Sequence, residues 1–407
     1  MNDNARSGDV ADHPPNLTPA AKAVCFGLLW LSGVALRLTI LVVPPIIPLL
    51  HAELRLSQTE VGVLSGLPPL LFCLAAIPGS LLVTRIGAVP ALVAGVMLTG
   101  LASAARAGSP GTILFFLTTI AMAAGISIMQ PVLPQLVRNW LPKQIGLATA
   151  VYISGLLVGE IIAVGLAVPV ILPLAGGSWR LSLVIWAVPV VLIAVLIWRF
   201  APRSARPASP TTLRSRWPDW SNPVVWRLGF LTGGVNSIYL STNFFLPDYM
   251  DALGRPDLIG DALVALNACQ VPAALLMLAF ADRMIRRKWA YGGSAVLLFL
   301  ALAGIIAMDG PWVVAWSGLI GFANSILLVL VFALPSILSA PDDVHRLSAG
   351  AFTISYMMAV LTPILGGALW DTTGYPPAAF APIILWPLVI VAMTAMIDLG
   401  RPAPGLS

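Results

Sequence analysis

Residues 201–222 read APRSARPASPTTLRSRWPDWSN and form the longest polar break in an otherwise apolar chain. Proline, serine and arginine dominate this stretch, a composition typical of an exposed linker. Two long and mostly apolar regions flank it, residues 23–200 and 223–398. The break therefore predicts a chain of two halves, with 201–222 as the linker between them.

The composition of the flanking regions indicates a membrane protein. Of the 407 residues, 58% are hydrophobic and only 10% are charged, and the mean hydropathy is +0.93. A soluble domain carries about 25% charged residues, so this chain lacks the charges needed to cover a water-facing surface. We predict an all-α integral membrane protein.

Apolar runs mark the expected spans, since a membrane helix needs about 20 mostly apolar residues. The first half supplies segments at roughly 23–50, 58–84, 88–106, 110–137, 144–174 and 179–199. The second half supplies segments at roughly 223–250, 258–281, 289–308, 311–339, 346–370 and 377–398. These runs predict twelve transmembrane helices in two pseudo-symmetric six-helix bundles.

The lysines and arginines predict the orientation. Seventeen of the 22 fall in loops on the side of the N-terminus, four (Arg55, Arg106, Arg180 and Arg255) fall on the other side, and Arg37 stays inside the membrane. Cationic loops resist translocation, so both termini are expected in the cytoplasm and the protein in the cell inner (plasma) membrane. The polar ends 1–22 and 399–407 are expected to be cytoplasmic tails, the first of them disordered. The basic loops also account for the net charge of +5 without nucleic-acid binding.

The two halves echo each other at a nearly constant offset. The matched positions are Pro48 with Pro247, Arg85 with Arg283, and Pro142 with Pro341, at offsets of 198 or 199 residues. Such an internal duplication is typical of transporters, whose binding site lies near the middle of the membrane between the repeats.

A basic motif after the eighth expected span resembles the major facilitator superfamily. The stretch ADRMIRRK contains Asp282, Arg283, Arg286, Arg287 and Lys288. The matching stretch after the second span, VTRIGAVP, keeps Arg85 but has Thr84 where the family has an aspartate. The resemblance implies two bundles that rock about a central site, with Asp282, Arg283, Arg286, Arg287 and Arg85 as conformational gating residues.

Longer stretches resemble the cyanate/2-nitroimidazole transporter family within that superfamily. They include Arg37 with the prolines that follow it, SQTEVGVLSGLPPLLFCLAA (57–76), PQLVRNWLPKQIGLATAVY (134–152), FFLPDYM (244–250) and LTPILGGALWDTTG (361–374). The similarity extends over most of residues 28–380 and implies that the substrate is a small anion.

Arg37 is the first candidate site residue, because it lies within the apolar stretch GVALRLTILVVPPIIP, residues 33–48. A charge at the centre of an isolated membrane helix costs about 2.5–3.5 kcal/mol on insertion scales, and a guanidinium cannot deprotonate to avoid this cost. Arg37 must therefore face water, a charged partner or a ligand. Its planar fork of donors suits a carboxylate or a small planar anion. The structural alternative is an ion pair with an acid on another span.

Glu160 is the acid that lies well inside an expected span, in YISGLLVGEIIAVG. One interpretation pairs it with Arg37 until an anion displaces it. A second makes it a proton carrier, because burial favours the neutral acid. The structural alternative is a carboxyl held by hydroxyls such as Tyr152 or Ser154.

Polar residues on the seventh span extend the candidate substrate site. Adding the repeat offset of 199 to Arg37 gives Asn236, and Tyr239 and Asn243 follow at helical spacing on the same face. Other polar residues deep in spans are Gln130, Asn267, Gln270, Asn324 and Tyr356. Each of these also has a structural alternative as a hydrogen-bonding residue between helices.

Pro44, Pro45 and Pro48 remove backbone donors and predict an interruption in the outer part of the first span. Pro68 and Pro69 predict a similar disturbance in the second span. Small residues four apart, such as Gly155 and Gly159, predict close contact between helices.

Together these features predict a secondary transporter of a small anion that works by alternating access, as a monomer and without cofactor or metal. An exporter of neutral drug-like compounds and a non-transporting membrane sensor are the alternatives. An enzyme or primary pump is not expected, since His13, His51 and His345 are scattered and the sequence has no phosphate-binding loop.

Overall fold

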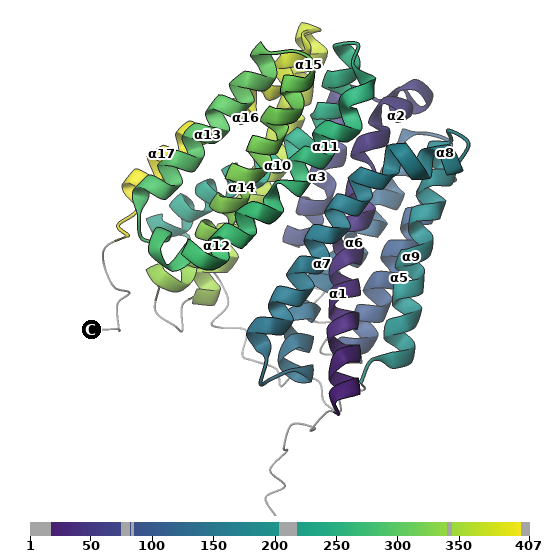
Figure 1. Cartoon of the computed structure of the whole chain (residues 1–407), viewed down its shortest axis with the longest axis vertical. Helices are drawn as coiled ribbons and strands as arrows, with labels where there is room; N and C mark the ends of the chain where they lie inside the picture. Colours follow the sequence, from purple (N-terminus) through teal and green to yellow (C-terminus); the bar gives the residue numbers. More distant parts are fainter. Residues whose placement is uncertain (1–17, 75–81, 83–84, 203–217, 340–343, 400–407) are drawn as a thin grey trace, which may run out of the picture.

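The computed structural model describes residues 18–74, 82, 85–202, 218–339 and 344–399, and the described part is almost entirely helical, with no strand. Two groups of helices lie side by side, one from each half of the chain (Figure 1). Most of the tail 1–22, the linker 201–222 and the tail 399–407 lies outside the described residues, so the disorder predicted for the first tail and the cytoplasmic location predicted for all three stay predictions.

Helices follow the expected segments of the first half closely. They are α1 (Pro19–Leu41), the 3-10 turn η1 (Pro44–Ile46), α2 (Ile47–Leu54), α3 (Gln58–Leu74), α5 (Ala88–Arg106), α6 (Thr112–Trp140), α7 (Ile145–Leu166), the π-helical turn η2 (Ala167–Ile171), α8 (Leu172–Leu174) and α9 (Trp179–Phe200).

The second half repeats this pattern. Its elements are α10 (Pro223–Ala252), the 3-10 turn η4 (Pro256–Leu258), α11 (Ile259–Ala268), α12 (Gln270–Met284), α13 (Lys288–Ala307), α14 (Pro311–Leu338), α15 (Val344–Thr373), the 3-10 turn η5 (Pro376–Phe380), α16 (Ala381–Ile384) and α17 (Trp386–Met396).

Ten helical segments in the described part of the chain are long and apolar enough to cross a membrane, which makes this a multi-pass membrane protein. Of the segments predicted from sequence, 58–84 and 223–250 are not among the ten. The helix α3 is described over 17 residues only. The helix α10 has 30 residues but carries many serine, threonine and asparagine side chains, most of them buried inside the protein. Its polarity therefore reflects an interior position, which hydropathy does not detect.

The first span breaks where its prolines predict. Pro44 and Pro45 cannot donate to the carbonyls of Ile40 and Leu41 four residues earlier, so α1 ends at Leu41 and the chain passes through η1 into α2. The second span differs from the expectation, because α3 continues through Pro68 and Pro69 as a helix.

Arg106 stabilises the broken end of α1. Its Nη2 donates to the carbonyl of Thr39 at 3.0 Å and to Ser103 Oγ at 2.7 Å. A cation is favourable at the C-terminus of a helix, where carbonyls lack partners. Arg106 was expected in a loop, but it is the last residue of α5 and is fully buried.

Glycines let α1 and α7 approach closely. A Cβ at Gly33 would overlap the carbonyl oxygen of Tyr152, and one at Gly155 would overlap that of Trp30. At Gly159, a Cβ would lie 2.6 Å from the carbonyl oxygen of Val34. The backbones of α1 and α7 are therefore in direct contact, as the small-residue spacing predicts.

The two halves meet chiefly along two helix pairs, α3 with α15 and α7 with α11. Gly62 of α3 faces the backbone of Pro363, and Gly367 of α15 faces that of Gln58. The two halves thus touch along these helices. The end of the molecule farthest from the start of α1 is here called the distal end (Figure 1).

Candidate functional site

Arg37 and Glu160 form an ion pair in the middle of the helical region. Arg37 Nε lies 3.2 Å from Glu160 Oε1, and the side chains are 33% and 5% exposed respectively. The close packing of α1 on α7 brings the two residues together. A third of the Arg37 side chain thus stays uncovered by the protein, whereas Glu160 is enclosed.

The same carboxylate is also bonded to the second half. Gln270, the first residue of α12, donates from Nε2 to Glu160 Oε2 at 3.2 Å. The two carboxylate oxygens of Glu160 thus face different halves of the protein. Oε1 faces Arg37 of α1, and Oε2 faces Gln270 of α12. The hydroxyl group of Tyr239 also interacts with this carboxylate.

A chain of hydrogen bonds continues from Gln270 into the second half. Asn267 Oδ1 accepts from the Tyr239 hydroxyl at 2.7 Å and is 3.5 Å from Gln270 Nε2. Asn267 Nδ2 donates to Asn243 Oδ1 at 2.9 Å. All four side chains are buried. Tyr239 and Asn243 of α10 therefore share a face and join one network, as their spacing predicts.

Asn236 does not join this network through any of its contacts in the described structure. Its Nδ2 donates to Ser355 Oγ of α15 at 2.9 Å, within the second half. The repeat offset led to Asn236, which lies on α10 with Tyr239 and Asn243. Its hydrogen bond to Ser355, however, fits the alternative role of a polar residue that joins two helices.

The remaining predicted residues lie around the network or away from it. Tyr356 of α15 stacks on Phe352 with ring centroids 6.1 Å apart and meets the edge of Phe72 at 5.7 Å. The hydroxyls of Tyr356 and Tyr239 both interact electrostatically with Arg37. Gln130 of α6 is exposed, and Asn324 of α14 is buried with its Oδ1 unpaired in the described structure.

This arrangement has a definite chemical capacity. A permanent, partly exposed cation is held by one enclosed carboxylate, with amides and a phenol beside them. An anion that enters next to Arg37 competes with Glu160 for the guanidinium. Alternatively, a proton on Glu160 removes the attraction and frees the guanidinium. Both events change the surroundings of the carboxyl group that Gln270 contacts, and so connect the site with the contact between the halves.

The basic motif at the end of α12 contacts the end of α17 in its own half. Arg286 Nη1 lies 3.4 Å from the carbonyl of Leu399, and Lys288 Nζ donates to that of Ala395 at 2.8 Å. Arg227 of α10 donates to the carbonyl of Met396 at 2.8 Å. These cations cap the C-terminal end of α17.

The other predicted gating residues are placed less fully. Arg85, Arg283 and Arg287 are exposed, and the side chain of Asp282 lies outside the described part of the structure. Their gating role stays a prediction.

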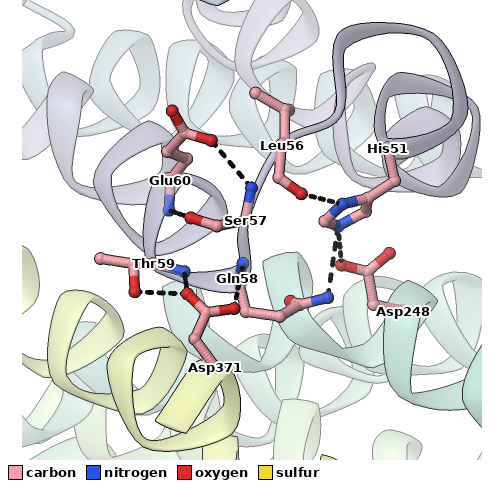
Figure 2. Close-up of polar contacts among 8 residues, drawn as sticks. All are labelled: His51, Leu56, Ser57, Gln58, Thr59, Glu60, Asp248 and Asp371. Atoms are coloured by element: carbon pink, nitrogen blue, oxygen red, sulfur yellow. Dashed lines mark hydrogen bonds and ion pairs between the residues drawn. The ribbon is translucent and has the colours of Figure 1, made fainter. Parts of the chain in front are cut away.

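Sequence reasoning assigned no role to a polar cluster at the distal end (Figure 2). His51 of α2 lies between the carbonyl of Leu56, 2.5 Å from Nδ1, and Asp248 Oδ2 of α10, 2.6 Å from Nε2. Asp371 of α15 accepts from the backbone nitrogens of Gln58 and Thr59 at 2.9 and 2.8 Å. Both aspartates thus come from the second half and bind the first.

A signal for this cluster was present in the sequence. Ser57 and Glu60 have the spacing of a capping box at the start of a helix, and they bond reciprocally in the structure at 2.8 and 3.1 Å. Asp248 and Asp371 lie within the quoted stretches FFLPDYM and LTPILGGALWDTTG. Both aspartates therefore lie in stretches that were singled out for their resemblance to the family. Their contacts with the first half, however, depend on tertiary structure.

Curated relatives match nearly the whole chain. It is 24% identical over 386 residues to the uncharacterized transporter YycB of Bacillus subtilis (strain 168), covering 94% of each protein. It is 24% identical to the 2-nitroimidazole transporter of Escherichia coli (strain K12), covering 83% of this chain and 86% of that protein. It is 25% identical to the cyanate transport protein CynX of the same organism, covering 85% of this chain and 90% of that protein. The resemblance inferred from sequence is thereby confirmed.

A solved structure agrees on the fold. The bacterial homolog of the human lysosomal transporter Spinster, in an inward-facing and unoccupied conformation, has a TM-score of 0.71 at 15% identity and covers 93% of this chain and 95% of that one. Residues 29–256, more than half of the chain, match the Major Facilitator Superfamily. The chain therefore belongs to the Major Facilitator Superfamily, and it is a membrane transporter.

Proposed function

We propose that this protein is a secondary transporter of a small anion, with twelve spans in two six-helix bundles that expose a central site alternately to each side of the inner membrane. The observation that carries the proposal is the Arg37–Glu160 ion pair, bonded through Gln270 to the other half. The basic loops support cytoplasmic termini, so the distal end of the molecule faces outward.

Arg37 supplies the anion contact in this proposal. An incoming anion takes the place of Glu160 on the guanidinium, where it gains charge-assisted hydrogen bonds. In the described structure the guanidinium faces Glu160 Oε1 through its Nε, and its Nη groups are further donors for a bound anion.

Glu160 couples substrate binding to the contact between the halves. When an anion draws Arg37 away, Glu160 becomes an enclosed carboxylate without its cation, an unfavourable state. Uptake of a proton by Glu160 relieves it. An anion and a proton then enter the site together, and the site keeps its net charge when the anion is monovalent. This balance favours anion transport coupled to protons.

The aromatic residues beside Arg37 favour a planar substrate. Tyr356 forms a cluster of stacked and edge-on rings with Phe352 and Phe72, and it lies within electrostatic range of Arg37, whose guanidinium is itself planar. Two of the relatives are named for cyanate and for 2-nitroimidazole, both small. The ring cluster also suits a neutral nitro-aromatic compound, which is the second candidate substrate class.

Uptake into proteoliposomes tests the proposal directly. The panel contains cyanate, small carboxylates, nitroimidazoles and neutral aromatic compounds, each with and without an inward pH gradient. Saturable uptake of an anion that rises with the gradient supports the proposal. Saturable uptake of neutral compounds alone supports the second class, and flux of none of them while the protein is folded contradicts a transport role for this set of substrates.

A further inference from the structure

Each of the two ring nitrogens of His51 faces an oxygen atom of another residue. The carbonyl of Leu56 lies against Nδ1, and Asp248 Oδ2 lies 2.6 Å from Nε2 (Figure 2). A carbonyl can only accept, so Nδ1 must carry a hydrogen. The neutral ring has just one N–H, which is then at Nδ1. Its Nε2 would therefore carry a lone pair that faces a carboxylate oxygen.

The second contact therefore requires one more proton. Either His51 is an imidazolium and Nε2–H donates to the Asp248 carboxylate, or Asp248 is protonated and its O–H donates to Nε2. Both arrangements place one proton between the two side chains. Asp248 is buried, with 5% of its side chain exposed, so water does not substitute freely for this proton.

Gln58 fits the protonated ring when its amide is turned around. Its Nε2 lies 3.3 Å from His51 Nε2, whereas its Oε1 is buried and unpaired in the described structure. With the amide nitrogen and oxygen exchanged, Oε1 would accept from the Nε2–H of His51, which Gln58 and Asp248 would then share.

Other charged groups around His51 are already engaged. Asp371 of α15 binds the start of α3 and lies within electrostatic range of the ring. Glu60 of α3 is held in its capping box by Ser57. On α2 itself, Glu53 is bonded to Arg180 of α9 at 2.7 Å, and Arg55 is exposed. Asp248 of α10 is thus the carboxylate that contacts the ring.

We propose that His51 and Asp248 form a proton-binding latch that holds the distal ends of the two halves together. His51 belongs to the first half and Asp248 to the second, so the latch breaks whenever the distal end opens. Asp371, which accepts hydrogen bonds from the backbone nitrogens of Gln58 and Thr59, also holds the distal ends of the two halves together. This contact does not require an additional proton. The proposal rests on the alternating access proposed above and assigns a separate proton site to it.

The pH dependence follows from counting protons. The closed latch holds one proton between His51 and Asp248. In the open state a solvated histidine loses its proton above pH about 6.5, whereas a solvated aspartate stays ionised. The closed state thus binds more protons than the open state above that pH. Raising the pH favours opening by up to about tenfold per pH unit, and the effect fades below pH about 6.5.

Distance measurements between spin labels test the latch. The labels replace Ile113 and Tyr375, which are 79% and 60% exposed and lie in different halves at the distal end, in a chain whose three native cysteines are changed to alanine. Double electron–electron resonance is recorded in lipid nanodiscs at pH 6, 7 and 8. The labelled protein with an unaltered latch should show a population with a long distance between the two labels, and this population should grow between pH 7 and 8.

Two variants remove the titration in different ways. Asp248→Asn lets the new amide donate to the Nε2 lone pair of neutral His51, so the end should stay closed at every pH. His51→Gln removes the titrating ring, so the population ratio should become independent of pH. Glu53→Gln, which alters an ion pair inside the first half, is the matched control and should keep the response.

The outcomes separate the latch from the proposed function. An open population that does not change with pH, or a pH response that survives in both His51→Gln and Asp248→Asn, overturns the latch alone. An absence of any open population at all pH values, with and without cyanate, overturns both the latch and the alternating-access proposal.

Discussion

Arg37 Nε lies 3.2 Å from Glu160 Oε1, and this ion pair links α1 to α7 at the point where the second half also reaches Glu160. Removing one partner of such a pair leaves an uncompensated charge in the protein. The pair therefore offers separate tests of substrate binding and of proton coupling.

Arg37→Lys keeps the positive charge but loses the planar fork. We expect anion uptake to fall about ten- to a hundredfold, equivalent to the loss of one charge-assisted hydrogen bond of about 1.5–3 kcal/mol. Initial rates in proteoliposomes measure the effect, and thermal unfolding shows that the variant is folded. Uptake close to that of the unaltered protein would show that the anion does not depend on this guanidinium.

Glu160→Gln removes the group that competes for Arg37 and carries the proton. We expect pH-driven accumulation to be lost while exchange of internal for external anion continues. The free arginine should also make the empty protein less stable and increase the rise in melting temperature caused by an anion. Loss of exchange and accumulation together, with no larger thermal shift, would assign Glu160 a structural role.

Gly33→Ala tests the close contact of α1 with α7. A Cβ there would overlap the Tyr152 carbonyl and lie 3.1 Å from the backbone nitrogen of Leu156, so the helices must separate. We expect a loss of about 1–3 kcal/mol in stability and reduced uptake, because Arg37 and Glu160 move apart with their helices.

Gly27→Ala, on the same helix, is the matched control, because a Cβ at Gly27 would meet nothing within 4 Å. Its melting temperature should be unchanged or higher, since alanine favours a helix over glycine by about 0.5–1 kcal/mol. Equal effects of the two substitutions would indicate that backbone flexibility, not packing on α7, is what matters.

Asp371→Ala tests the second contact at the distal end. The change removes the acceptor of the Gln58 and Thr59 backbone nitrogens and of the Thr59 hydroxyl. We expect the distal end to open more often at every pH, by about tenfold for one to two net hydrogen bonds. The spin-label distances measure this change.

Glu60→Gln provides the comparison, because Glu60 bonds to Ser57 within the first half. It should affect the stability of α3 but not the separation of the halves. A shift of the distances in Glu60→Gln equal to that in Asp371→Ala would mean that fraying of α3, rather than the contact between halves, controls opening.

The candidate site was predictable in part. Arg37 and Glu160 are charges in apolar segments, and such residues are costly enough in a membrane to draw attention by themselves. Asn267 and Gln270 were noticed as polar residues deep in a span, and they do lie in the network. Asn236 was inferred from the repeat offset, but a helical repeat fixes the element and not the partner of a side chain, and Asn236 bonds to Ser355 instead.

The amino-acid sequence alone determined the fold class, the positions of most helices and the break in the first span, because hydropathy, helix length and proline chemistry act over short stretches of chain. Only the tertiary structure decided which residues meet: Glu160 with Gln270 across 110 positions, and His51 with Asp248 across 197. These pairings depend on which helix faces turn toward one another, because the glycine spacing indicates that helices pack closely but does not specify the partner of a side chain on a distant helix.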